Sequence, residues 1–259
     1  MSATVMTQRI AEASPRLKAR IAGFFYLLNA GTAFAFFVRG KLVVSGDAAA
    51  TATNILAHER LFRMALAADL IGVASYVVVT ALLYDLFKPV NRNLSLLAAF
   101  FSLVGCAVQV FACVFHLASL IVLGGAPYLS VFKVEQLQAM ALMFLKLHGQ
   151  GFNIAIVFFG FYCLLIGYLI LRSTFLPQII GVLMALGGLA YVTNNLANFL
   201  SLPLPMYLSH SVPALGGLGE GSLMLWLLLA GVNAQRWKAQ AGAAGDGRSQ
   251  RAGEGRQGG

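Results

Sequence analysis

Polar side chains able to bind ligands or protons occur inside long apolar segments of this sequence. Asp69, His116, Asn195 and Glu220 each stand about five to seven residues from one end of such a segment, or roughly 8–11 Å at 1.5 Å per residue. An ionised Asp near the centre of a membrane helix costs roughly 2.5–3.5 kcal/mol on insertion scales. We therefore expect these groups to face protein or water, at one common depth.

Three further polar residues lie just beyond this depth, and the whole set predicts a polar cavity open to the outer face of a membrane. The candidate residues are Arg63, Asp69, His116, His148, Asn153, Asn195 and Glu220. Arg63 also has a simpler explanation. Glu59 precedes it by four residues, so the two side chains are placed to form an ion pair on one helix.

Two kinds of chemistry fit these residue types. The side chains can hydrogen-bond between helices, or His116, His148, Asp69 and Glu220 can together hold a divalent metal. A metal-dependent hydrolase would be expected to show a local ligand spacing such as HExxH or HxxxD, and neither supports these residues here. We therefore favour the hydrogen-bonded layer, and we predict no metal and no cofactor.

The composition is that of an integral membrane protein. Of the 259 residues, 59% are hydrophobic and only 10% are charged, and the mean hydropathy is +0.80, which is outside the range of a soluble domain. The net charge of +9 comes from basic residues in tails and loops, so we predict no nucleic-acid partner. Cys106, Cys113 and Cys163 lie inside apolar segments without a CxxC motif, and we interpret them as packing residues.

The apolar segments predict an all-α fold, a polytopic transmembrane helical bundle of about six spans. The expected spans are 21–38, 59–84, 94–123, 150–171, 179–200 and 213–232. Residues 134–171 are divided at Gly149, so that 134–147 forms an amphipathic helix in the membrane interface. In the loop that follows the first span, Asp47 is expected to cap a short helix.

Three regions follow from this assignment. Residues 1–20 form a basic tail, 21–232 the six-span bundle, and 233–259 a disordered tail rich in Gly, Ala, Gln and Arg. Basic residues are concentrated on one side of the predicted bundle, so both tails are expected to be cytoplasmic. The residues of that side include Arg9, Arg16, Lys18, Arg20, Lys88, Arg92, Arg172, Arg236 and Lys238.

Several loops and spans taken together are also typical of one family. The segments are FVRGKLVVSGDAAATATNIL, ERLFRMALAADLIG, LYDLFKPVNR, LKLHGQGFNIAIVFFGFYCLLIGYLILRS, LPQIIGVL and the Gly219-Glu220 pair of GLGEGSLMLWLL. They resemble the bacterial membrane proteins grouped as domain of unknown function 4386, over about residues 20–232. The resemblance implies a multi-pass protein of the bacterial inner membrane with about six helices. It carries no activity, substrate or catalytic residue.

These observations favour an accessory or small-ligand-binding bundle with an outward-facing polar cavity, and a role other than catalysis. The partners expected are the lipid bilayer and an unidentified small ligand. Two alternatives stay open: a small-molecule transporter and a membrane-embedded metal-dependent hydrolase. A transporter usually shows internal repeats or broken helices. Here the internal similarity is weak and joins only LFRMAL at 61–66 and LQAMAL at 137–142.

Overall fold

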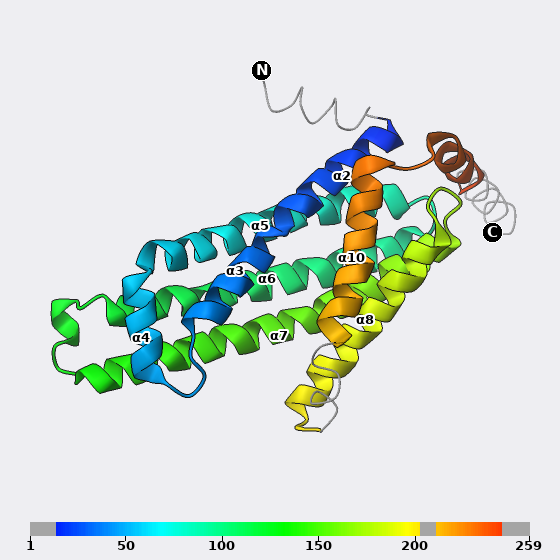
Figure 1. The fold of residues 1–259 in the computed structure, drawn as a ribbon. Helices are drawn as coiled ribbons and strands as arrows, with labels where there is room; N and C mark the ends of the chain where they lie inside the picture. The colour runs from blue at the N-terminus through cyan, green and yellow to red at the C-terminus, as the bar shows by residue number, and fades with distance from the viewer. Residues whose placement is uncertain (1–13, 203–210, 245–259) are drawn as a thin grey trace, which may run out of the picture. The chain divides into compact units, whose positions relative to one another are not determined.

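The computed structural model describes residues 14–202 and 211–244, and the regular structure in these ranges is helical (Figure 1). A last helix, Ala234–Ala244, follows the others at the C-terminal end of the described chain. The predicted all-α bundle is confirmed. In chain order the labelled elements are α2 (Pro15–Asn29), α3 (Gly31–Leu42), α4 (Ala48–Ala57), α5 (Glu59–Phe87), α6 (Arg92–Leu123), the 3-10 helix η1 (Pro127–Leu129), α7 (Val134–Arg172), α8 (Gln178–Phe199) and α10 (Ser211–Leu229).

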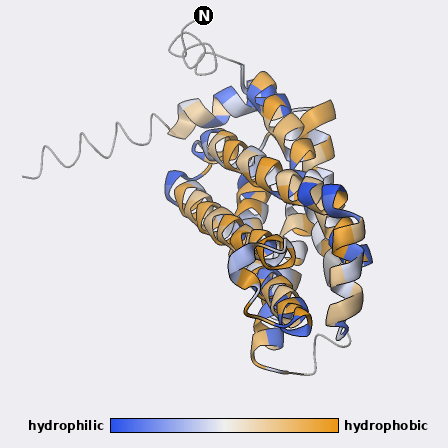
Figure 2. Cartoon of the chain, turned by 90° about the vertical axis from the view of Figure 1, so that its left-hand side faces the viewer, coloured by the Kyte–Doolittle hydropathy of each residue, from blue (hydrophilic) through white to orange (hydrophobic). Residues whose placement is uncertain are grey.

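Within the described ranges, five helical stretches are long and apolar enough to cross a membrane. They are α2 with α3, α5, α6, α7 and α8, and α10 makes a sixth if it is taken together with Ala234–Ala244, to which it is bent by 105°. Hydrophobic residues extend along most helical turns (Figure 2). Large side chains such as Phe36 and Phe111 are 68% and 64% exposed, as lipid-facing residues are. The architecture is that of a multi-pass membrane protein.

The chain divides into two compact units. Of the described residues, unit I comprises 14–25, 78–102, 159–202 and 211–244, and unit II comprises 26–77 and 103–158. Unit II has an apolar core built by α3, α4, α5, α6 and α7. Its buried members are Ala35, Val38, Leu42, Ile55, Phe62, Ala65, Leu120 and Leu145.

The loop after α3 forms the cap predicted from the sequence. Asp47 Oδ1 accepts a hydrogen bond from the Ala50 N–H at 2.8 Å and begins α4. Gly46 precedes it with φ +80°, a left-handed conformation that favours glycine. The hydroxyl of Thr51, 0% exposed, accepts from the Val44 N–H at 3.0 Å. These bonds hold α4 to the end of α3 within unit II.

The predicted division of residues 134–171 is wrong, because α7 is one continuous helix of 39 residues. Gly149 and Gly151 were expected to interrupt it. Both are helical, and the position that a Cβ of Gly151 would occupy lies 2.7 Å from Cβ of Ala112 on α6. A glycine that lets a neighbouring helix approach stabilises the helix pair by packing, which outweighs its low helix propensity.

In unit I, glycines bring α8 close to α7 and to α10, and α8 and α10 lie side by side (Figure 1). A Cβ at Gly167 of α7 would lie 2.8 Å from the backbone N of Ala185 on α8. A Cβ at Gly219 of α10 would lie 2.8 Å from the carbonyl oxygen of Leu183. Backbones at this separation are typical of small-residue interfaces in membrane bundles.

The described chain is helical close to both of its ends. Helix α2 begins at Pro15, within the residues 1–20 assigned to the basic tail, and Lys18 pairs with Asp85 at 2.8 Å. The expected disorder of 233–259 differs from the helix at Ala234–Ala244, and residues 245–259 lie outside the described chain. Trp237 Nε1 donates to the Leu86 carbonyl at 2.9 Å. This contact holds the C-terminal helix in place, and the composition of the segment does not predict it.

Candidate functional site

The central feature of unit II is a buried ion pair between α3 and α5. Arg39, in the last turn of α3, donates from Nη1 to Asp69 Oδ2 at 2.5 Å and from Nη2 to Oδ1 at 3.4 Å. The side chains are 13% and 3% exposed. An arginine that donates to both oxygens of a carboxylate forms a strong ion pair. Asp69 therefore faces protein rather than lipid, as expected from the cost of a charge in the membrane.

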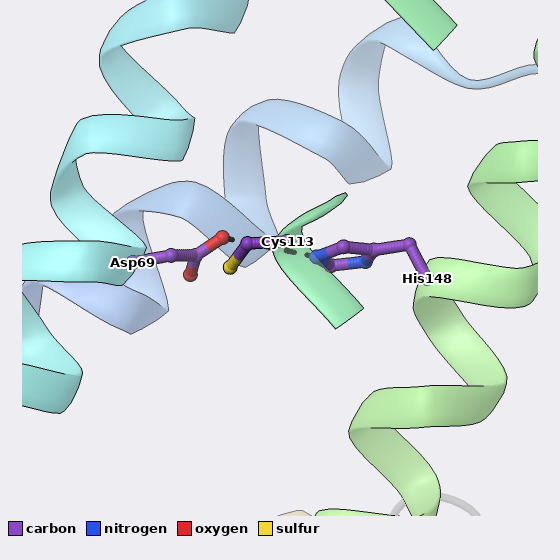
Figure 3. A group of neighbouring side chains, drawn as sticks. All are labelled: Asp69, Cys113 and His148. Atoms are coloured by element: carbon purple, nitrogen blue, oxygen red, sulfur yellow. Dashed lines mark ion pairs between the residues drawn. The ribbon is translucent and has the colours of Figure 1, made fainter. Parts of the chain in front are cut away.

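Two further helices bring potential metal ligands to the same carboxylate. His148 Nε2, from α7, lies 3.9 Å from Asp69 Oδ2. Cys113 of α6 completes a buried group in which one ligand atom from each of Asp69, Cys113 and His148 lies within 4.8 Å of the others (Figure 3). An oxygen, a sulfur and a nitrogen donor therefore meet at one point inside unit II.

His116 extends this group by one helical turn of α6. Its ring stacks on Phe62 with centroids 3.9 Å apart and lies edge-on to the His148 ring at 5.7 Å. Nε2 is 3.1 Å from the Phe62 carbonyl oxygen, which only accepts, so Nε2 carries a proton. Nδ1 is buried without a hydrogen-bond partner among the described residues. We refer to Arg39, Asp69, Cys113, His116 and His148 as the Asp69 centre.

Three of the predicted site residues lie together in the structure, and the other four have different surroundings. Asp69, His116 and His148 meet in the Asp69 centre. Arg63 is 58% exposed and pairs with Glu59 at 2.7 Å, as expected of an i,i+4 pair. Asn153 lies on α7 in unit II and is partly buried.

The remaining two predicted residues belong to unit I. Asn195 Nδ2 donates to the Tyr191 carbonyl of its own helix at 2.9 Å. Glu220 Oε1, on α10, accepts from the thiol of Cys163 on α7 at 3.8 Å. Both groups therefore have local partners within their own unit.

Clefts that the structure does show on the described residues are lined by other side chains. One of about 630 Å³ in unit I is lined by residues that include Arg16, Trp226 and Arg236, and one of about 360 Å³ in unit II lies between α3 and α4, against Phe37 and His58. The polar cavity expected around the candidate residues stays a prediction.

Sequence reasoning missed two members of the Asp69 centre. The charge pattern places Arg39 in an external loop, although a buried Asp requires a counter-charge and Arg39 lies at the outer end of the first span. Cys113 was interpreted as packing, although it follows Gln109 and precedes His116 on one face of α6. The need for a counter-charge and the shared face of α6 make these two residues candidates, but neither signal says which helices face one another.

Comparison with known proteins gives a family and no activity. A protein of the archaeon Archaeoglobus fulgidus, described as an uncharacterized protein, is similar to this chain, with 26% identity over 157 residues that cover 60% of this chain and 76% of that protein. No solved structure matches the chain significantly. The family model described as "Domain of unknown function (DUF4386)" matches residues 21–231, most of the chain, and the protein belongs to that family.

Proposed function

We propose that this protein is a small-ligand-binding bundle of the bacterial inner membrane, and that the Asp69 centre is its binding site. The observation that carries the proposal is the burial of an ion pair and two histidine rings at one point of unit II. Ionisable groups inside membrane helices are costly, and proteins that retain them use them in binding or transport.

The incomplete hydrogen bonding of this centre supports binding over a purely structural role. Buried polar networks that only hold helices together have their donors and acceptors satisfied. Here His116 Nδ1 is buried and lacks a partner among the described residues. A bound ligand would supply that partner.

A small-molecule transporter is the second candidate, favoured by the bend of 105° between α10 and Ala234–Ala244, which makes the sixth apolar stretch a bent helix pair. Discontinuous spans are a feature of many transporter binding sites. Transport would add movement of the ligand to the binding proposed here, and uptake into vesicles that contain the purified protein would distinguish the two functions.

Ligand-dependent stabilisation tests the proposed function directly. The full-length protein in detergent is heated with separate panels of small organic acids, lipids and divalent metals. A ligand present at 100 times its Kd stabilises the folded state by about 2.7 kcal/mol, a readily measured rise in Tm. The rise should be absent in Asp69→Asn and present in Arg63→Gln, whose side chain is exposed. Equal stabilisation of both variants would place the ligand elsewhere.

The proposed topology puts both termini in the cytoplasm, because basic residues gather on that side of the bundle. Reporters at the N-terminus, at Asn91 and after Val232 should therefore read cytoplasmic. Reporters at Asp47 and Lys133 should read external. A cytoplasmic reading at Asp47 would contradict the orientation.

A further inference from the structure

We infer that the Asp69 centre binds a divalent transition-metal ion of the zinc class, with Asp69, Cys113 and His148 as its protein ligands. This inference rests on the proposed function, since it names the ligand of the same site. It departs from the sequence-based prediction of no metal because Cys113, which the sequence analysis treated as packing, joins the group.

The donor set selects the class of ion. Calcium and magnesium are held by oxygen ligands, whereas zinc accepts a carboxylate oxygen, an imidazole nitrogen and a thiolate sulfur in one site. The three residues of this centre offer one donor of each kind. Three protein ligands leave a tetrahedral ion one open position, as in zinc sites that bind a further molecule.

The separations are close to those that an ion requires. Ligand atoms at zinc distances of about 2.0–2.3 Å, arranged tetrahedrally, are roughly 3.3–3.6 Å apart. Asp69 Oδ2 and His148 Nε2 are 3.9 Å apart, and all three donors lie within 4.8 Å. The ligands come from α5, α6 and α7, and metal binding would draw the three donors together by side-chain rotation on these helices (Figure 3).

His116 and Arg39 are placed as the outer partners of such a site. His116 donates from Nε2 to the Phe62 carbonyl, and in the neutral ring Nδ1 could accept a hydrogen bond from water bound to the ion. Arg39 donates to both oxygens of the Asp69 carboxylate, including the Oδ2 that faces His148, so this oxygen would accept from Arg39 with one lone pair and bind the ion with the other.

Charge balance follows from this arrangement. Metal binding replaces the proton of the Cys113 thiol, so one proton is released for each ion bound. The ion with one carboxylate and one thiolate is neutral, and Arg39 adds a positive charge. The open position is therefore suited to an anionic oxygen donor.

Cobalt substitution tests the inference on the intact protein. Full-length protein purified without added metal is titrated with Zn²⁺ or Co²⁺ in detergent, and metal content, proton release and the thiolate-to-cobalt charge-transfer absorption are measured. We expect about one ion per chain, one proton released per ion, and the charge-transfer band. Absence of the band from the wild-type protein would overturn the inference without any variant.

Two cysteine variants on one helix make the test specific. Cys113→Ser removes the proposed thiolate, and Cys106→Ser, two turns earlier on α6 and equally buried, is its matched control. The band and stoichiometric ion should be lost only in Cys113→Ser. Equal behaviour of the two variants would contradict the assignment. If metals fail to bind while an organic acid stabilises the wild type and not Asp69→Asn, the metal inference fails and the proposed function stands.

Discussion

Arg39→Gln is expected to lower the free energy of unfolding by about 3–5 kcal/mol, because Asp69 is then buried without its counter-charge. The pair is 2.5 Å apart and both side chains are largely shielded from solvent. Reversible unfolding of the full-length protein in mixed micelles measures the loss, and metal must be absent so that no ion replaces the lost charge.

Two comparisons show whether burial is the cause. Arg63→Gln removes an equally charged side chain from an exposed pair and should cost well under about 1 kcal/mol. The double variant Arg39→Met with Asp69→Leu removes both charges together, and it should be more stable than Arg39→Gln. If Arg39→Gln and Arg63→Gln lower the free energy of unfolding equally, burial of the Arg39–Asp69 pair does not increase its contribution to stability.

Gly167→Ala is expected to cost about 1–3 kcal/mol through overpacking. The added Cβ would lie 2.8 Å from both the Ala185 nitrogen and the Gly181 carbonyl oxygen, so α7 and α8 must separate within unit I. Backbone atoms cannot rotate away as the end of a side chain can. Unfolding in micelles again provides the measurement.

Gly149→Ala on the same helix is the matched control. A Cβ at Gly149 has nothing within 4 Å, and alanine has the higher helix propensity, so this variant should be neutral or more stable by up to about 1 kcal/mol. A large loss in Gly149→Ala would show that α7 needs glycine there for another reason. Equal tolerance of both substitutions would exclude the close packing at Gly167.

The sequence predicted those parts of the fold that depend on local or one-dimensional signals. Apolar length predicts spans, and the Gly46-Asp47 turn predicts the cap of α4, as the structure has it. The continuity of α7 was not predictable in this way. Gly149 and Gly151 read alone indicate a break, and the packing of Gly151 against Ala112 appears only once α6 and α7 are placed together.

The candidate site likewise combines features that the sequence predicts with contacts that it does not. Depth along a span is readable from sequence, and it selected Asp69 and His116 but also Asn195 and Glu220, which lie in unit I. Depth does not say which helices face one another, so the pairing of Asp69 with Arg39 and the approach of Cys113 could not be assigned. These contacts depend on lateral packing, which no single span encodes.

The length of α7 bears on how an ion would reach the Asp69 centre. A straight helix of 39 residues is about 58 Å long, nearly twice the roughly 30 Å hydrocarbon thickness of a bilayer. A helix of this length extends beyond the hydrocarbon, and Lys146, two residues before His148, is exposed. In the proposed topology this end of α7 is external, so an ion would reach the Asp69 centre from the external aqueous phase.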